Sequence, residues 1–81
     1  MAATGGPVRA ADADGRAGHR IRAARTTAGL TQQGLATAVQ VSRQTVIAME
    51  RGDYAPSVYL ALKVAGALGV TVEALWGESA S

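Results

Sequence analysis

One stretch decides the fold of this chain: Thr31 to Gly52, which reads TQQGLATAVQVSRQTVIAMERG. Its apolar residues recur at the spacing of two short crossed helices joined by a tight turn. Those expected to be buried between the helices are Leu35, Ala36, Val39, Val41, Val46 and Met49. Arg43, Gln44 and Thr45 are left outside, at the front of the second helix. The pattern therefore predicts a helix-turn-helix, a unit whose second helix can enter the major groove of DNA.

Start and stop signals for helices extend this interpretation along the chain. Four Ser or Thr N-caps and four terminal glycines fall where five helices require them: Gly29, Thr31, Ser42, Gly52, Ser57, Gly69, Thr71 and Gly77. We therefore expect helices over residues 16–28, 32–38, 43 to 50 or 51, 58–68 and 72–76. No strand pattern and no internal repeat is present, so the sequence predicts an all-α, compact five-helix bundle.

Apolar spacing also predicts which faces of the outer helices are buried. The first helix carries an apolar stripe formed by Ala17, Ile21, Ala24 and Ala28. For the fourth helix, the residues expected to face inward are Val58, Ala61, Leu62, Ala65 and Leu68.

Composition excludes several classes of function. Among the 81 residues there is no Cys and a single His, His19, so one chain can form neither a disulfide nor a histidine-based metal site. His19 is assigned no role. No carboxylate pair, nucleophile–base pair or metal cluster is apparent, so we expect no enzyme activity, no cofactor and no metal. No apolar run approaches the roughly 20 residues of a membrane span, and no small-molecule ligand is indicated.

The net charge is +2, and its distribution along the chain is more informative about function than the total. Between Gly15 and Gly52 six Arg face a single Glu, giving +5, whereas residues 53–81 give −2 and residues 1–14 give −1. Positive charge therefore gathers on the half that carries the predicted helix-turn-helix. That distribution suits a surface that binds phosphate groups.

With the helices placed, the chain resembles the Cro/C1-type (Xre) helix-turn-helix family of bacterial and phage regulators, whose fold is of the lambda-repressor-like type. The motifs that carry the resemblance are IRAAR (21–25), GLTQ (29–32), LA (35–36), VSRQTV (41–46), MERG (49–52), PS (56–57) and AGALGV (65–70). Their order and spacing span about residues 21–76. The resemblance implies a sequence-specific, DNA-binding transcriptional regulator, expected to repress from a palindromic operator in the cytoplasm, at the nucleoid.

The resemblance also implies roles for individual residues. Arg43, Gln44 and Thr45 match positions that read base edges, Arg43 being open to either base or phosphate contact. Positions expected at the DNA backbone are Gln32, Gln33, Arg51, Tyr54 and Ser57. Arg25 and Glu50 match a structural ion pair between the first and third helices.

Three residues depart from the family pattern. Gln40 stands in the turn where Gly is usual, at a cost of about 1 kcal/mol if the turn requires positive φ. Gly34 replaces a capping Glu, so the capping box is missing. Asp53 stands where many relatives carry Lys or Arg near a phosphate, which bears on DNA affinity and not on the fold.

A homodimer is expected, because one half-site offers too few contacts for specificity. Its candidate residues are Val72, Leu75 and Trp76 at the fifth helix, although Trp76 could instead seal the core. Residues 15–77 form the predicted DNA-binding domain. Residues 1–14 are expected to be a disordered tail, with a DNA-wrapping arm as the alternative, and residues 78–81 a flexible C-terminus.

Two function classes stay open from the sequence. The first is the DNA-binding regulator, with antitoxins and restriction–modification controllers as sub-types. The second is a protein-interaction module that retains the fold without binding DNA. The Arg-rich first half and the front of the third helix favour the first class.

Overall fold

Five helices make up the part of the chain, residues 16–77, that this computed structural model describes. They are α2 (Arg16–Thr27), α3 (Gln32–Val39), α4 (Arg43–Arg51), α5 (Val58–Leu68) and α6 (Val72–Trp76). Every boundary lies within one residue of its predicted position, and no strand occurs among these residues, so the all-α prediction is confirmed. The predicted tail (1–14) and C-terminus (78–81) lie outside the described residues.

Side-chain caps fix where four of these helices begin. The hydroxyl oxygens of Thr31, Ser42, Ser57 and Thr71 each accept a hydrogen bond from the backbone N–H three residues later, at 2.8–3.2 Å. Each cap satisfies one of the backbone donors that a helix start leaves unpaired. The α3–α4 turn differs from the other helix ends, because its αL position is occupied by Gln40 at φ 65°.

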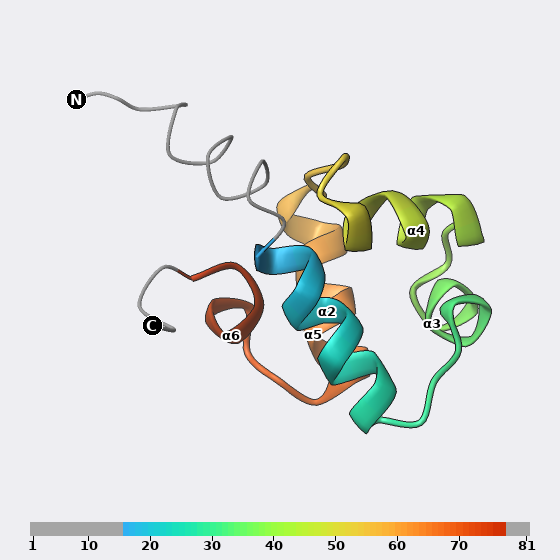
Figure 1. Ribbon diagram of the computed structural model, residues 1–81, viewed down its shortest axis with the longest axis horizontal. Helices are drawn as coiled ribbons and strands as arrows, with labels where there is room; N and C mark the ends of the chain where they lie inside the picture. Colours follow the sequence, from blue (N-terminus) through green and yellow to red (C-terminus); the bar gives the residue numbers. More distant parts are fainter. Residues whose placement is uncertain (1–15, 78–81) are drawn as a thin grey trace.

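The helices enclose one apolar core. Its buried members are Ile21, Leu35, Ala36, Val39, Val46, Met49, Val64, Ala65, Leu68 and Leu75. Figure 1 shows α3 and α4 together on one side of α2, with α6 on the other side and α5 behind. The helix-turn-helix therefore stands on a base formed by the other three helices.

The predicted inner face of α5 was partly wrong. Ala61, Ala65 and Leu68 are buried as expected, but Val58 is 74% exposed and Leu62 56% exposed, while Val64 is fully buried. The helix, VYLALKVAGAL, is apolar almost all round, so its sequence offers no polar face that would fix its rotation. Ala28 is also exposed, because α2 ends one residue before it.

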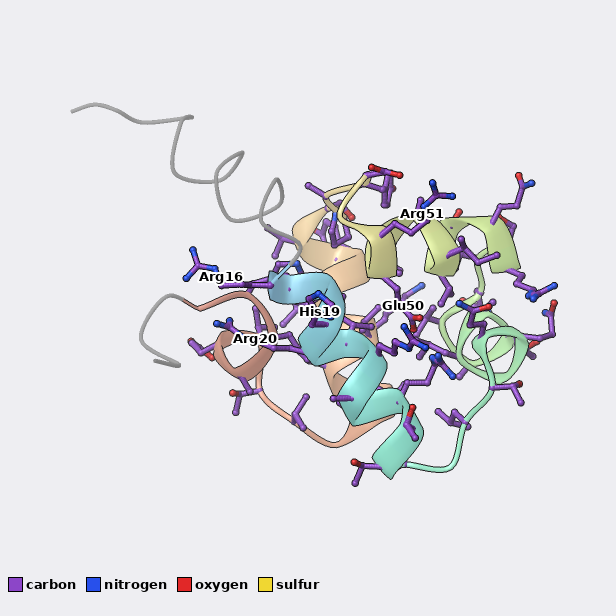
Figure 2. All side chains as sticks on the ribbon, in the orientation of Figure 1. Arg16, His19, Arg20, Glu50 and Arg51 are labelled. Atoms are coloured by element: carbon purple, nitrogen blue, oxygen red, sulfur yellow. The ribbon has the colours of Figure 1, made fainter. Side chains whose placement is uncertain are left out.

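Two contacts of α2 position the rest of the bundle. At Gly18 the backbone of α2 approaches the end of α4 so closely that a Cβ atom would collide with the carbonyl oxygen of Glu50. Farther along, the Arg20 guanidinium donates to the carbonyl oxygens of Leu75 (3.3 Å) and Gly77 (2.8 Å), and Figure 2 shows it reaching toward α6. α2 thereby connects the end of α4 to α6.

Candidate nucleic-acid interface

The first turn of α4 holds the three predicted base-reading residues. Ser42 caps the helix, and Arg43 and Gln44 follow it with exposed side chains. Thr45 is half-buried, and its hydroxyl lies 3.1 Å from that of Ser42, so it is already engaged locally. The rear of the same helix is anchored in the core by Val46 and Met49. A rigidly held helix thus offers two long polar side chains to its surroundings.

A line of polar contacts runs inward from Arg43. Its Nη2 donates to Oε1 of Gln32 at 3.5 Å, and Nε2 of Gln32 donates to Oε1 of Glu50 at 3.2 Å. Gln32 was predicted to contact phosphate, and in this structure its amide joins α4 to the start of α3. Its position supports the orientation of Arg43.

Arg25 and Glu50 form an ion pair between α2 and α4. Nε and Nη2 of Arg25 donate to the two carboxylate oxygens at 2.6 and 3.2 Å, and Nη1 donates to the Leu30 carbonyl oxygen at 2.9 Å. The two side chains are only 12% and 5% exposed. Figure 2 shows Glu50 between the two helices. Because the pair is desolvated and bidentate, it fixes how α4 sits on α2.

The predicted backbone-contacting residues occupy both flanks of α4. Gln33 is exposed at the start of α3. Arg51, Tyr54 and Ser57 follow one another from the end of α4 to the start of α5, where the Ser57 hydroxyl is used as the cap of that helix. Nε of Arg51 lies 3.6 Å from Oδ2 of Asp53, and both side chains are mostly exposed. Asp53 therefore offsets part of the charge that Arg51 would offer to a phosphate.

An open groove joins these elements on one face of the molecule. Its lining comes from α2, α4 and the start of α3: His19, Arg22, Arg25, Thr31, Gln32, Gln33, Arg43, Ile47, Glu50 and Arg51. Glu50 is its one acidic residue, and it is paired with Arg25. The groove is therefore positively charged, which suits a polyanion.

The dimer candidates on α6 are less available than expected. Leu75 is 1% exposed and belongs to the core, while Val72 and Trp76 are half-buried against it. The large apolar side chains that do face solvent lie elsewhere, at Tyr54, Val58, Tyr59 and Leu62. Sequence reasoning did not find this surface, because it assigned Val58 and Leu62 to the core.

Two other structural roles were missed by sequence reasoning. Gly18 carries no local signal, since its requirement comes from a neighbouring helix. Arg20 resembles the other arginines of α2 in sequence but caps carbonyl groups of α6.

Within residues 16–77, no three acidic, His or Cys side chains gather as a metal site would need. No helix in that range has the length and apolar character to cross a membrane.

Comparison with known proteins agrees with this geometry. The sequence profile of the Helix-turn-helix family matches residues 21–75, so the chain belongs to the Cro/C1-type helix-turn-helix family of DNA-binding transcriptional regulators. An uncharacterized HTH-type transcriptional regulator of Methanothermobacter thermautotrophicus is 55% identical over 49 residues, which cover 60% of this chain and 71% of the relative.

Two further similar proteins have named regulatory functions. The immunity repressor protein of Bacillus phage phi105 is 44% identical over 61 residues, covering 75% of this chain and 42% of the repressor. The crystal structure of the restriction–modification controller protein C.AhdI from Aeromonas hydrophila superposes with a TM-score of 0.71 at 38% identity. That match covers 78% of this chain and 97% of the controller. The fold and the class of DNA-binding regulator are thereby established.

Proposed function

We propose that this protein binds a palindromic operator as a homodimer and represses transcription from it, in the cytoplasm and without enzymatic activity. The proposal rests on Arg43 and Gln44, two exposed side chains on the first turn of a helix whose rear lies in the core. The Gln44 amide matches adenine N6 and N7, and the Arg43 guanidinium matches guanine O6 and N7. Backbone contact falls to Gln33, Arg51, Tyr54 and the N-terminal N–H groups of α5.

Gln44→Ala tests the base-reading assignment. Each wrong base pair at the position read by Gln44 should cost the native protein about 1–3 kcal/mol, and the variant should lose that discrimination. Arg51→Ala is the matched control, because it should weaken binding to all sequences alike. Titrations on the DNA upstream of its own gene, with single-base changes and several salt concentrations, give both results. An unchanged base preference in Gln44→Ala would remove the assignment.

A second copy of the chain is proposed to cover the exposed apolar face of α5 formed by Val58, Tyr59 and Leu62, hereafter the α5 face. These side chains expose on the order of 400 Å² per chain, judged from typical side-chain areas. Two copies would bury on the order of 800 Å² through these side chains alone, close to the lower limit for a specific interface. A two-fold contact brings one patch onto itself, as an uncharged apolar face permits.

Sedimentation of the native protein and of Tyr59→Asp tests the location of the dimer contact. The native chain should sediment as a dimer and Tyr59→Asp as a folded monomer, because a charge at the centre of the α5 face cannot be desolvated cheaply. Trp76→Ala serves as the comparison at α6. Should Trp76→Ala dissociate the dimer while Tyr59→Asp leaves it intact, the contact lies at α6. DNA protection should extend over two half-sites about one helical turn apart.

A restriction–modification controller is the more specific sub-type that one observation favours, since the superposition covers nearly all of such a protein. The interaction-module alternative makes the opposite prediction for DNA. A native protein that shows no salt-dependent DNA binding would favour that alternative.

A further inference from the structure

The structure divides the basic residues of α2 into those that hold the fold and those that do not. Arg20 donates to the carbonyl oxygens of Leu75 in α6 and of Gly77 just after it, and Arg25 donates to Glu50 and to the Leu30 carbonyl oxygen. Arg22 and His19 are exposed, and neither has a hydrogen-bond or ion-pair partner among residues 16–77. The exposed pair has no structural task within the described part of the chain.

These two side chains share a surface with the DNA-contacting residues. They stand three residues apart on α2, so they project from the same side of that helix. Both line the open groove that also holds Gln33, Arg43 and Arg51. Close packing of α2 on the end of α4 at Gly18 makes the two helices one continuous surface there.

Charge on this part of the groove is uncompensated. Glu50 is the one acidic group that lines it, and its two oxygens already accept from Arg25, with Gln32 donating to one of them. Arg22 therefore faces a groove without an available carboxylate. A phosphodiester group is an anion of the size and geometry that a guanidinium binds in a bidentate manner.

We infer that α2 supplies an additional DNA-backbone contact, in which Arg22 binds a phosphate and His19 donates a ring N–H beside it. This inference rests on the proposed DNA binding and extends its footprint beyond the helix-turn-helix. Such a contact adds affinity for every sequence alike and leaves base preference unchanged. It also explains why two exposed basic side chains of α2 line the same groove as the recognition helix.

Salt-dependent binding titrations on Arg22→Ala test the inference. Removing one phosphate contact per chain should flatten the plot of log affinity against log salt by about 0.9 for each chain bound. Between 50 and 200 mM salt, the variant should therefore lose about threefold less affinity per chain than the native protein. Arg22→Lys should keep most of the native slope. Lys63→Ala removes the same charge from α5, outside the groove, and should keep all of it.

The possible results distinguish a failure of the Arg22 contact from a failure of the proposed DNA binding. Binding by the native protein together with an unchanged slope in Arg22→Ala would overturn the inference while leaving the regulator intact. A slope lowered equally by Lys63→Ala would also overturn it, because the effect would then belong to net charge. A lowered slope together with an altered base preference would assign Arg22 to a base edge and contradict the proposal. Circular dichroism of Arg22→Ala and Arg22→Lys checks that folded proteins are compared.

Discussion

At the scale of single residues, Gln40 stands out because it holds a left-handed backbone conformation, φ 65° and ψ 44°, that favours glycine. It is the one non-glycine residue among 16–77 with positive φ. The conformation closes α3, since the backbone N–H of Val41 donates to the Ala36 carbonyl oxygen at 3.0 Å. The turn therefore holds a residue with a Cβ atom in a backbone conformation that is strained for it.

Gln40→Gly should raise the free energy of unfolding by about 0.5–1 kcal/mol, because glycine adopts positive φ without a Cβ clash. The substitution also removes the 3.3 Å hydrogen bond from Nζ of Lys63 to Oε1 of Gln40, which is exposed and of small value. Gln40→Ala is the control, because it removes that bond and keeps the strain. Chemical denaturation should rank the glycine variant highest, and a ranking with alanine above glycine would contradict the strain.

Glu50 and Glu73 offer a second comparison between single residues. Glu50→Ala leaves Arg25 unpaired at 12% side-chain exposure, which typically costs about 3–5 kcal/mol. Glu73 is exposed on the first turn of α6, where a carboxylate contributes about 0.3–1 kcal/mol through the helix dipole. Equilibrium denaturation should therefore show a several-fold larger loss for Glu50→Ala. Equal losses would mean that the ion pair does not hold α2 to α4.

At the scale of helices, the same substitution, Gly to Ala, should change stability in opposite directions at two positions. Gly18→Ala places a methyl group against the backbone of Glu50 and should destabilise the protein by about 1–3 kcal/mol. Gly66→Ala meets open space within α5 and should stabilise it by about 0.5–1 kcal/mol, since alanine is the better helix former. Thermal melting of both variants checks the pair. A stable Gly18→Ala protein would show that α2 can move away from α4.

Helix boundaries could be predicted from this sequence, whereas helix rotation could not in every case. Caps such as Thr31 and Ser42 act on their own first turns, so the signal and its effect lie within four residues. The buried face of α5 depends on what the other helices leave uncovered. Val58 and Val64 are the same residue type on one helix, and only the tertiary arrangement decides that the second is buried.

At the scale of the whole molecule, the sequence predicts that positive charge gathers on one half, and the structure distinguishes arginines with structural partners from Arg22. Arg20 and Arg25 have structural partners, and Arg22 has none among residues 16–77. The candidate site could be located from the motif, because its residues lie close together in sequence. The groove that joins α2 to it could not, because it depends on the contact at Gly18.

At the scale of the whole surface, we expect Asp53 to weaken DNA binding by offsetting the charge of Arg51. Asp53→Asn removes the carboxylate beside Arg51 and should raise affinity for all DNA sequences several-fold at low salt. Stability should change little, since an exposed ion pair contributes about 0–1 kcal/mol. Glu73→Gln makes the same charge change on α6 and should leave affinity close to native. A similar gain from both variants would assign the effect to net charge instead of Arg51.

The line of contacts from Arg43 through Gln32 and Glu50 to Arg25 has one end in solvent and one end largely buried between α2 and α4. Its outer link, at 3.5 Å, is the longest, and the inner link, at 2.6 Å, is the shortest. We therefore expect substitutions at Arg43 to leave the protein folded, whereas substitutions at Arg25 or Glu50 should destabilise it and be lost during evolution. The DNA sequence preference of related proteins can then change faster than the helical scaffold that positions residue 43.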